Sequence, residues 1–334
     1  MTGNSSQAEY EGVRPITGAI RFQPIGEAKI RKAALLKKYI LEPEILIMPG
    51  AHDALSARII EKTGFKAAVV GGYSATAALL GKPDISFLTL TEMVEHIARL
   101  TGVVEIPFLV DGDTGHGGVL NVARTVKELE RAGAAGIFIE DQVFPKRCGH
   151  MEGKQVVGRE DMVAKIEAAL DARSDPDFVI MARTDALAVH GLKEAIERGN
   201  LYRQTGADVI FVEAPRSIEE MRRINQEIDA PTLANNVEGG KTPLLPAKKL
   251  EAIGYNAVIF PVSATYATAK AVTLLMEELK GTGTTTGLKD QMWQFSEFSQ
   301  FIGVEDLRRQ ERLYLDQGRA AVAEPGVRRK GRAR

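Results

Sequence analysis

Apolar residues are concentrated in eight short, nearly continuous runs, and each run is followed by a longer segment in which apolar residues recur every three or four positions. Continuous runs are typical of strands buried on both faces, and the longer spacing is typical of amphipathic helices. The predicted strands span residues 45–48, 67–70, 108–111, 136–140, 179–182, 209–212, 232–234 and 257–260. The predicted helices span residues 53–62, 91–100, 119–131, 159–172, 192–204, 218–227, 246–252 and 263–279.

Turn residues support this alternation. A glycine stands between helix and next strand at five places, as helix C-caps do: Gly64, Gly102, Gly133, Gly206 and Gly254. Eight strand–helix units of this length favour an α/β fold of the (β/α)8 TIM-barrel type. An open, doubly wound sheet is the alternative, but no Gly-x-Gly-x-x-Gly loop follows any strand.

The pattern divides the chain into four parts. We expect an N-terminal extension (1–26), the barrel (27–280), a C-terminal helical segment (281–320) and a basic tail (321–334). The helical segment has two periodic stretches, 289–301 and 305–316, and the first carries Trp293, Phe295, Phe298 and Phe301. Exposed aromatic surface of this size needs a partner, either on the same barrel or on a neighbouring subunit.

Composition restricts the partners. The net charge is −1 with 44% hydrophobic and 26% charged residues, so no overall field attracts the protein to nucleic acid or to a membrane. The basic residues at 328–334 favour a solvated terminus over a polyanion-binding arm. No apolar run reaches the roughly 18 residues of a transmembrane helix, and residues 1–10 lack a secretory signal. The single cysteine, Cys148, excludes an internal disulfide and favours a reducing, cytoplasmic location.

Acidic residues end two neighbouring strands. Asp111 and Asp113 are two positions apart and therefore point to the same side, and Glu140 and Asp141 end the next strand. Neither segment contains a lysine, so the acids would repel one another without a cation. Hard oxygen ligands favour Mg²⁺. The alternative is that an individual acid caps a helix or pairs with a surface arginine.

The loop at residues 143–154 follows directly and contains Cys148 among basic residues and glycines. Cationic neighbours lower the pKa of a thiol and make it a usable acid or base, so we expect a reactive Cys148 rather than an inert one. The length of the loop and its glycines are typical of a lid that closes over a substrate.

The remaining strand ends add binding groups. Arg183 can hold a carboxylate or an oxyanion with two hydrogen bonds, although a structural ion pair is the alternative. The backbone N–H groups at Gly71, Gly72 and Tyr73 can cradle a carboxylate. The sixth and seventh strands end beside Glu213 and Asn235.

Several of these segments together resemble the isocitrate lyase/phosphoenolpyruvate mutase superfamily. The motifs are Asp-Gly-Asp-Thr-Gly-His-Gly-Gly (111–118), Glu-Asp-Gln (140–142), Lys-Arg-Cys-Gly-His (146–150), Ala-Arg-Thr-Asp (182–185) and the segment 235–243. The resemblance spans roughly residues 30–316. It implies a barrel with Mg²⁺ (or Mn²⁺) at its mouth, a mobile catalytic loop and a homotetramer whose paired subunits exchange a C-terminal helix.

The resemblance also implies roles for single residues. Asp111 would bind the metal directly, with Asp84, Asp113 and Glu140 acting through water. Cys148, Arg183 and His150 would be catalytic. Substrate would contact the residues Gly71, Gly72, Tyr73, Gly149, Glu213, Asn235 and Pro261.

Within the superfamily, Cys148 favours the carbon–carbon lyases, because phosphonate-forming mutases carry an asparagine-containing loop at this place. The methylisocitrate lyase/2,3-dimethylmalate lyase branch is the most similar. It implies Mg²⁺-dependent cleavage of the C2–C3 bond of a 2-hydroxy di- or tricarboxylate, with release of a 2-oxo acid such as pyruvate. Cys148 would donate the proton that quenches the leaving enolate.

The substrate is narrowed by one departure from the methylisocitrate lyases, which place an arginine five residues after the proline of the eighth strand. Here Tyr266 stands five residues after Pro261, so we favour a 2-alkylmalate over a tricarboxylate. An oxaloacetate decarboxylase or hydrolase is the nearest alternative, although Pro261 favours a lyase. A phosphonate C–P enzyme of the carboxyvinyl-carboxyphosphonate phosphorylmutase type comes third. A non-catalytic barrel is disfavoured by the complete set of acids.

Overall fold

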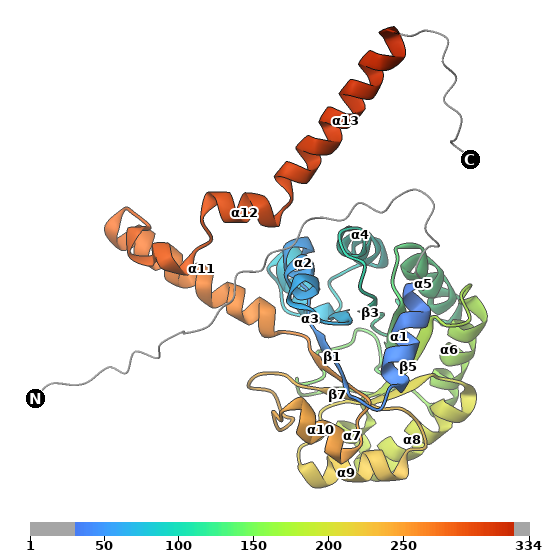
Figure 1. Cartoon of the computed structure of the whole chain (residues 1–334). Helices are drawn as coiled ribbons and strands as arrows, with labels where there is room; N and C mark the ends of the chain where they lie inside the picture. The colour runs from blue at the N-terminus through green and yellow to red at the C-terminus, as the bar shows by residue number, and fades with distance from the viewer. Residues whose placement is uncertain (1–30, 324–334) are drawn as a thin grey trace, which may run out of the picture. The chain divides into compact units, whose positions relative to one another are not determined.

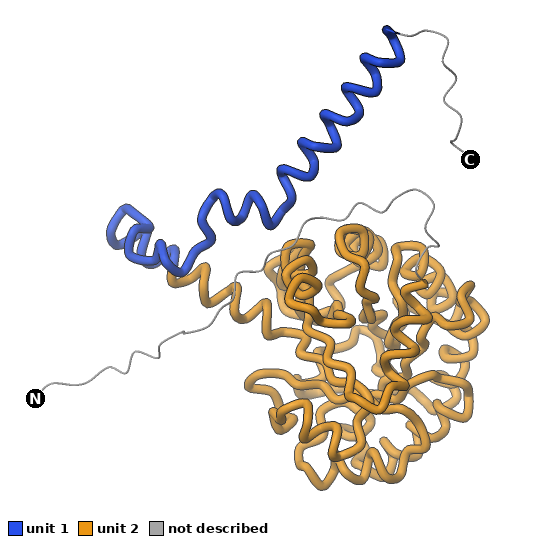
Figure 2. Tube along the Cα trace, in the orientation of Figure 1, with its two compact units in different colours: residues 1–28, 275–334 blue, residues 29–274 orange. Residues whose placement is uncertain are grey.

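The computed structural model describes residues 31–323 (Figure 1). The chain forms two compact units, which meet in sequence between Leu274 and Leu275 (Figure 2). The first contains all eight strands, and the second contains the C-terminal helices. The expected N-terminal extension and the basic cluster at 328–334 lie outside the described residues.

The eight strands run parallel around a closed barrel. Neighbouring strands pair in the orders β1-β8-β7 and β2-β3-β4-β5-β6. Isolated parallel bridges between Gly50 and Val69 and between Ile210 and Thr232 join the two sets into a ring. The strands are β1 (Leu46–Pro49), β2 (Ala68–Val70), β3 (Phe108–Asp111), β4 (Gly136–Glu140), β5 (Val179–Thr184), β6 (Val209–Val212), β7 (Leu233–Asn235) and β8 (Ala257–Phe260).

Helices surround this ring, and the predicted (β/α)8 architecture is confirmed. The helices of the barrel unit begin with α1 (Lys32–Leu41), α2 (Ala54–Thr63), α3 (Gly72–Leu80), α4 (Leu90–Thr101), α5 (Val119–Arg131) and α6 (Arg159–Ala172). They continue with α7 (Ala186–His190), α8 (Leu192–Thr205), α9 (Ile218–Glu227), α10 (Ala247–Ile253) and the start of α11 (Ser263–Thr282). All eight predicted helices are present, whereas α1, α3 and α7 were not predicted.

Local sequence sets the helix ends as expected. Asp53 caps α2, where its carboxylate accepts a hydrogen bond from the Ser56 backbone N–H at 2.7 Å. Gly64 and Gly206 end α2 and α8 with φ angles of 98° and 118°, a left-handed conformation that only glycine adopts without strain.

The barrel interior is filled by apolar side chains from the strands, including Met48, Val69 and Leu109. Leu36 and Ile40 of α1 belong to the same buried cluster, together with Ala135 and other residues at the amino ends of the strands. Helix α1 therefore closes the amino end of the barrel, and the carboxyl end is left for polar groups.

The barrel closes tightly between β1 and β8. A Cβ atom at Gly50 would lie 2.2 Å from the carbonyl oxygen of Pro261, so only glycine fits there. The same carbonyl accepts a hydrogen bond from the Ser74 hydroxyl at 2.7 Å, which ties α3 to this seam.

The second unit contains the end of α11, a 3₁₀ turn at Thr286–Gln291, α12 (Phe295–Phe301) and α13 (Val304–Ala323). Trp293 packs against Phe298 and Phe301, with ring centroids 6.2 and 5.2 Å away. Phe295 is 90% exposed, and α13 exposes apolar side chains such as Leu313 and Tyr314. The predicted aromatic helix at 289–301 is thus shorter than expected, and part of its apolar surface is unpartnered within the described chain.

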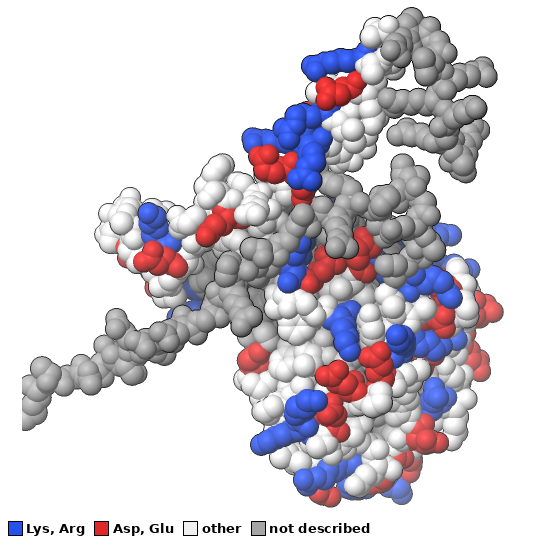
Figure 3. Space-filling view, in the orientation of Figure 1, with Lys and Arg blue, Asp and Glu red and all other residues white. Residues whose placement is uncertain are grey.

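Basic and acidic side chains alternate over the face of the barrel unit that Figure 3 shows, and they form no extended patch of one sign. No helix among the described residues is long and apolar enough to cross a membrane.

Candidate active site

A cavity of about 240 Å³ opens at the carboxyl end of the barrel. Its walls come from the ends of several strands and from the loop at residues 143–154, which we call the Cys148 loop. The lining residues are Gly71, Gly72, Tyr73, Asp84, Asp111, Phe138, Cys148, Gly149, His150, Met151, Arg183, Phe211, Glu213, Asn235, Val237, Glu238, Gly239, Gly240, Ile259, Pro261, Val262 and Tyr266.

Every predicted site residue except Asp113 and Glu140 lines this cavity. These two lie directly behind its wall. Asp113 makes an ion pair with Lys146, and Glu140 makes one with Arg183. The structure therefore brings the predicted residues together, including Asp84, which lies between α3 and α4, far from the strand motifs.

The acids converge beside the start of α3. A Cβ atom at Gly72 would lie 3.1 Å from Oδ2 of Asp111, 3.3 Å from Oδ1 of Asp113 and 3.3 Å from Nζ of Lys146. Asp111 is fixed by the backbone N–H groups of Gly72 and Asp113, at 2.8 and 2.9 Å. The N–H of Gly72, which we expected to cradle a substrate carboxylate, thus donates to a carboxylate of the protein itself.

Lys146 lies among these acids, although neither acidic segment, 111–118 or 140–142, contains a lysine. Its side chain is 2% exposed, and Nζ is 2.7 Å from both Asp84 and Asp113. Burial disfavours the ammonium form, but the surrounding carboxylates outweigh burial and hold the pKa of Lys146 well above its usual value. The lysine comes from the Cys148 loop, which the order of motifs in the sequence does not place beside β3.

One lysine does not neutralise the cluster. Burial raises the pKa of Asp84, and it raises the pKa of Asp111 to about 6 although Lys146 opposes this. Asp113 is different, because the ammonium of Lys146 outweighs burial and lowers its pKa. Burial raises the pKa of Glu140 well above its usual value, with Arg183 as the main opposing charge. A further cation would favour the charged form of all these groups.

The donor set fits a hard divalent cation. Both oxygens of Glu140 are buried and accept no hydrogen bond within the described chain. Six buried carboxylates (Asp84, Asp111, Asp113, Glu140, Asp185 and Glu213) face three buried cations (Lys146, Lys154 and Arg183). No three His, Cys, Asp or Glu side chains of the described chain surround one point as metal ligands. Carboxylate oxygens are hard ligands of the kind that Mg²⁺ prefers, and Mg²⁺ commonly keeps several waters when one or two carboxylates bind it.

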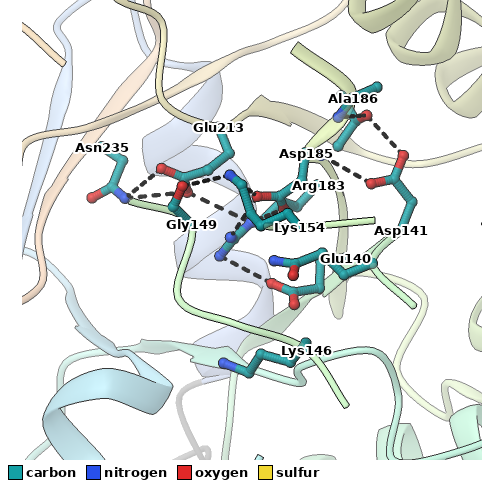
Figure 4. Close-up of polar contacts among 12 residues, drawn as sticks. Glu140, Asp141, Lys146, Gly149, Lys154, Arg183, Asp185, Ala186, Glu213 and Asn235 are labelled. Carbon is teal, nitrogen blue, oxygen red and sulfur yellow. Dashed lines mark hydrogen bonds and ion pairs between the residues drawn. The ribbon is translucent and has the colours of Figure 1, made fainter. Parts of the chain in front are cut away.

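Arg183 crosses the floor of the cavity and is shared among three carboxylates (Figure 4). It lies 3.1 Å from Glu140 and donates to Asp185 at 2.9 Å, and its Nε is 3.5 Å from Glu213. Its guanidinium also stacks over Phe211 at 5.3 Å. Arg183 is therefore ion-paired and also lines the cavity, and its role in holding a substrate stays a prediction.

Asp141 does not face the cavity. Its carboxylate accepts hydrogen bonds from Thr184, Arg198 and Tyr202 at 2.7, 3.0 and 2.9 Å. It also accepts one from the Asp185 backbone N–H at 2.9 Å (Figure 4). The expectation that Asp141 joins the acids at the mouth is wrong, because adjacent residues on a strand point to opposite sides.

The Cys148 loop packs against Arg183 and Glu213 of the cavity lining. A Cβ atom at Gly149 would lie 2.5 Å from Glu213 and 2.6 Å from Arg183, so the backbone touches both side chains. His150 is 3.2 Å from Glu213 through Nε2 and accepts a hydrogen bond from the Lys241 backbone N–H at 3.0 Å. Asn235 donates to Glu213 at 3.3 Å.

Cys148 lines the cavity and is partly exposed. Burial raises the pKa of its thiol to about 11, although a backbone hydrogen bond at His150 and the charge of Arg183 oppose this. The expected lowering by cationic neighbours is therefore wrong, because burial outweighs their charge, and Lys146 and Lys154 are already paired with carboxylates. Cys148 is a protonated thiol at neutral pH.

The far side of the cavity differs from the acidic side. Tyr73 and Tyr266 meet edge to face with centroids 6.2 Å apart, and Pro261 and Val262 add apolar surface. The one charged side chain on this wall is Glu238, which accepts a hydrogen bond from Ser263. Sequence reasoning identified Tyr266 but not Glu238, whose position depends on the path of the loop after β7.

Comparisons with known proteins agree with this geometry. A family profile described as phosphoenolpyruvate phosphomutase matches residues 36–280. The 2,3-dimethylmalate lyase of Eubacterium barkeri is 48% identical over 282 residues, which cover 84% of this chain and 98% of that protein. The 2-methylisocitrate lyase of Aeropyrum pernix is 42% identical over 281 residues, covering 84% and 90%.

Solved structures show the same fold. A crystal structure of 2,3-dimethylmalate lyase, described as a PEP mutase/isocitrate lyase superfamily member, superposes with a TM-score of 0.79 and 34% identity, covering 90% of this chain and 99% of that one. Phosphonopyruvate hydrolase in complex with oxalate and Mg²⁺ superposes with a TM-score of 0.78 and 28% identity, covering 86% and 100%. The chain therefore belongs to the PEP mutase/isocitrate lyase superfamily.

Proposed function

We propose that the protein is a carbon–carbon lyase that cleaves a small 2-hydroxy dicarboxylate of the 2-alkylmalate type and releases a 2-oxo acid. The observation that carries the proposal is the meeting of the acid cluster, Arg183 and a protonated Cys148 in one cavity. The similarity to 2,3-dimethylmalate lyase along nearly its whole length supports the same reaction class.

Mg²⁺, with Mn²⁺ as a substitute, is the proposed cofactor. Asp111 would hold it directly, and Asp84, Asp113 and Glu140 would act through coordinated water. When bound, the metal would stabilise negative charge on the 2-oxygen and the adjacent carboxylate of the substrate. Both oxygens of Glu140 are buried and accept no hydrogen bond within the described chain, although one is ion-paired with Arg183. These oxygens and the surplus of carboxylates support this assignment.

The protein groups carry the remaining steps. Arg183 stabilises the oxyanion that forms when the 2-hydroxyl gives its proton to water. The electron pair of the C2–C3 bond moves to the leaving fragment, and C2 becomes the carbonyl carbon of the 2-oxo acid. Cys148 then gives its proton to the enolate carbon of the leaving fragment, and the thiolate regains a proton from water. Glu213 and Asn235 position His150 and Gly149 around the substrate.

The far wall of the cavity selects the substrate. A third carboxylate beside Tyr73 and Tyr266 would meet the negative charge of Glu238, whereas the basic lining residue Arg183 is already paired with Glu140, Asp185 and Glu213. An alkyl group in the same place would contact aromatic and apolar surface instead. A 2-alkylmalate therefore fits this wall better than a tricarboxylate such as 2-methylisocitrate.

We further propose a cytoplasmic homotetramer in which paired subunits exchange C-terminal helices. The exposed Phe295 and the apolar side chains of α13 support a partner for this segment, and the single cysteine is compatible with a reducing compartment. Light scattering coupled to size-exclusion chromatography would give four times the chain mass. A monomer in solution would contradict the assembly but not the chemistry.

The test of function is a substrate panel. Purified protein with Mg²⁺ is assayed for 2-oxo acid release from 2,3-dimethylmalate, 2-methylisocitrate, isocitrate, oxaloacetate and phosphonopyruvate. We expect turnover of the dialkylmalate above all others. Preferred turnover of oxaloacetate or phosphonopyruvate would overturn the proposal.

The proton donor is tested separately with Cys148→Ser. Removing the acid should lower kcat by at least about 100-fold, the lower range of acid–base contributions, while the melting temperature stays within a few degrees of the parent value. Full activity of C148S would show that another group protonates the enolate.

A further inference from the structure

Lys154 is a buried lysine that the proposed reaction does not use. Its side chain is 2% exposed, although it belongs to the Cys148 loop at the surface end of the barrel. Nζ donates to the carbonyl oxygen of Gly149 at 2.5 Å and to Oδ1 of Asp185 at 2.6 Å (Figure 4). An ammonium in such a place loses its hydration and is retained only with good partners.

Its partner Asp185 is fixed to the barrel wall. The carboxylate of Asp185 is fully buried and also accepts hydrogen bonds from Arg183 at 2.9 and 3.2 Å. The backbone N–H of Asp185 donates to Asp141, which Thr184, Arg198 and Tyr202 hold in turn. Asp185 is therefore a rigid anchor, and one carboxylate holds both Arg183 and Lys154.

The other partner, Gly149, is the residue next to the proton donor. Its backbone already touches Glu213 and Arg183, where no Cβ atom would fit. A turn begins here, because the N–H of Met151 donates to the Cys148 carbonyl at 2.8 Å. A hydrogen bond to the Gly149 carbonyl therefore fixes the peptide between Gly149 and His150, one residue after Cys148.

We propose that Lys154 is a positioning residue, whose ammonium fastens the turn at Cys148, Gly149 and His150 to Asp185 and so places the thiol beside Arg183. Its role in catalysis depends on the proposed lyase function, whereas its role in holding the turn does not. Loss of the ammonium releases the Gly149 carbonyl, and the loop then exposes Cys148 to solvent.

The same loop offers a matched control. Glu152 forms an ion pair with Lys241 at 2.5 Å, but its side chain is 84% exposed. An exposed pair of this kind contributes little to stability. Glu152→Gln removes one ion pair of the loop, as Lys154→Met does, but leaves the buried tie intact.

The first measurement is the rate at which iodoacetamide alkylates Cys148, the single cysteine of the chain, followed by intact mass at pH 8. We expect K154M to react at least tenfold faster than the parent protein. E152Q should react within twofold of the parent, and Lys154→Arg, which keeps the charge and can reach both acceptors, should restore most of the protection. Should K154M fail to fold, K154Q, which keeps one donor group, takes its place.

The second measurement is steady-state turnover on the best substrate of the panel. We expect kcat of K154M to fall at least about 100-fold with KM changed by less than threefold, because the thiol is misplaced while the binding groups remain. If folded K154M is alkylated at the parent rate, or if E152Q is alkylated as fast as K154M, the proposal is overturned. If the parent protein has no lyase activity, the proposed function is refuted. The alkylation test of Lys154 remains valid in that case.

Discussion

At the scale of single residues, the protonated state of Cys148 has a measurable consequence. Burial raises the pKa of this thiol to about 11, so the neutral form is favoured in the folded protein. With that pKa, only about one thiol in a thousand is ionised at pH 8, against roughly one in four for an ordinary cysteine. The alkylation rate of the parent protein should therefore be far below that of glutathione at pH 8 and rise about tenfold for each pH unit up to pH 10.

Unfolding the protein in urea gives the control, because the thiol then behaves like that of a peptide. If the folded protein reacts at the rate of glutathione, Cys148 is an ionised thiolate and not a protonated thiol. Such a thiolate could not protonate an enolate.

Tyr266 gives a second prediction at this scale, because it stands where a third carboxylate would need a cation. Tyr266→Arg places a guanidinium near Tyr73 and Glu238 in the cavity wall. We expect kcat/KM for 2-methylisocitrate to rise at least tenfold relative to 2,3-dimethylmalate, since one hydrogen bond between charged groups contributes about 1.5–3 kcal/mol. Tyr266→Phe, which adds no charge, should leave that ratio within threefold. If the ratio of the two kcat/KM values is unchanged in Y266R, Tyr266 does not determine substrate specificity.

Individual site residues were predictable to different degrees. Asp111 and Asp113 were predicted to lie together from the two-residue period of a strand, and they do, although β3 ends at Asp111 and Asp113 has a φ of 48°. Lys146 could not be placed, because its position depends on a loop that folds back over β3. The pKa of Cys148 was predicted in the wrong direction, since sequence proximity to basic residues does not reveal which of them are already paired.

At the scale of elements, helix α8 is tied to the sheet by a polar cluster. Tyr202 is fully buried, and its hydroxyl donates to the Asp141 carboxylate at 2.9 Å. Tyr202→Phe removes one of four donors to a buried charge and should lower the free energy of unfolding by about 1.5–3 kcal/mol, measured by urea denaturation.

Tyr39→Phe is the matched control on α1. The Tyr39 ring lies under the Lys66 ammonium, a contact that phenylalanine keeps. We expect its free energy of unfolding to stay within about 0.5 kcal/mol of the parent value. If both variants are equally stable, the hydroxyl of Tyr202 has no net role in holding α8.

The elements that were missed share a physical cause. Helix α7 has five residues, too few to show a helical period, and α3 consists largely of small residues behind two glycines. In α1 the buried positions Ala33, Leu36 and Ile40 do carry helical spacing, but the helix precedes the first strand and lies outside the repeated unit. The eight strands were predicted within two residues at each end, because burial on both faces leaves continuous apolar runs.

At the scale of the whole molecule, the surplus of buried carboxylates couples the proposed metal to folding. A cation that binds the folded barrel alone stabilises it by about 2.7 kcal/mol at 100 times its Kd. Saturating Mg²⁺ should therefore raise the melting temperature measured by calorimetry, relative to NaCl of equal ionic strength. Asp111→Asn, which keeps an acceptor oxygen for one of the two N–H groups of Gly72 and Asp113, should abolish the rise.

An equal rise of the melting temperature in D111N would show that the metal does not bind at Asp111. No rise in the parent protein would argue against a metal at the acid cluster. Neither result requires the substrate to be known. The measurement therefore tests metal binding at the acid cluster independently of the reaction.

The seam between β1 and β8 has one more consequence. Gly50 lies outside the cavity, yet its backbone abuts the very residue, Pro261, that forms part of the cavity wall. The contact between β1 and β8 that closes the barrel therefore also forms one side of the substrate cavity. A single methyl group added at position 50 would push on that wall, so a substitution at this seam would change which substrates the enzyme prefers.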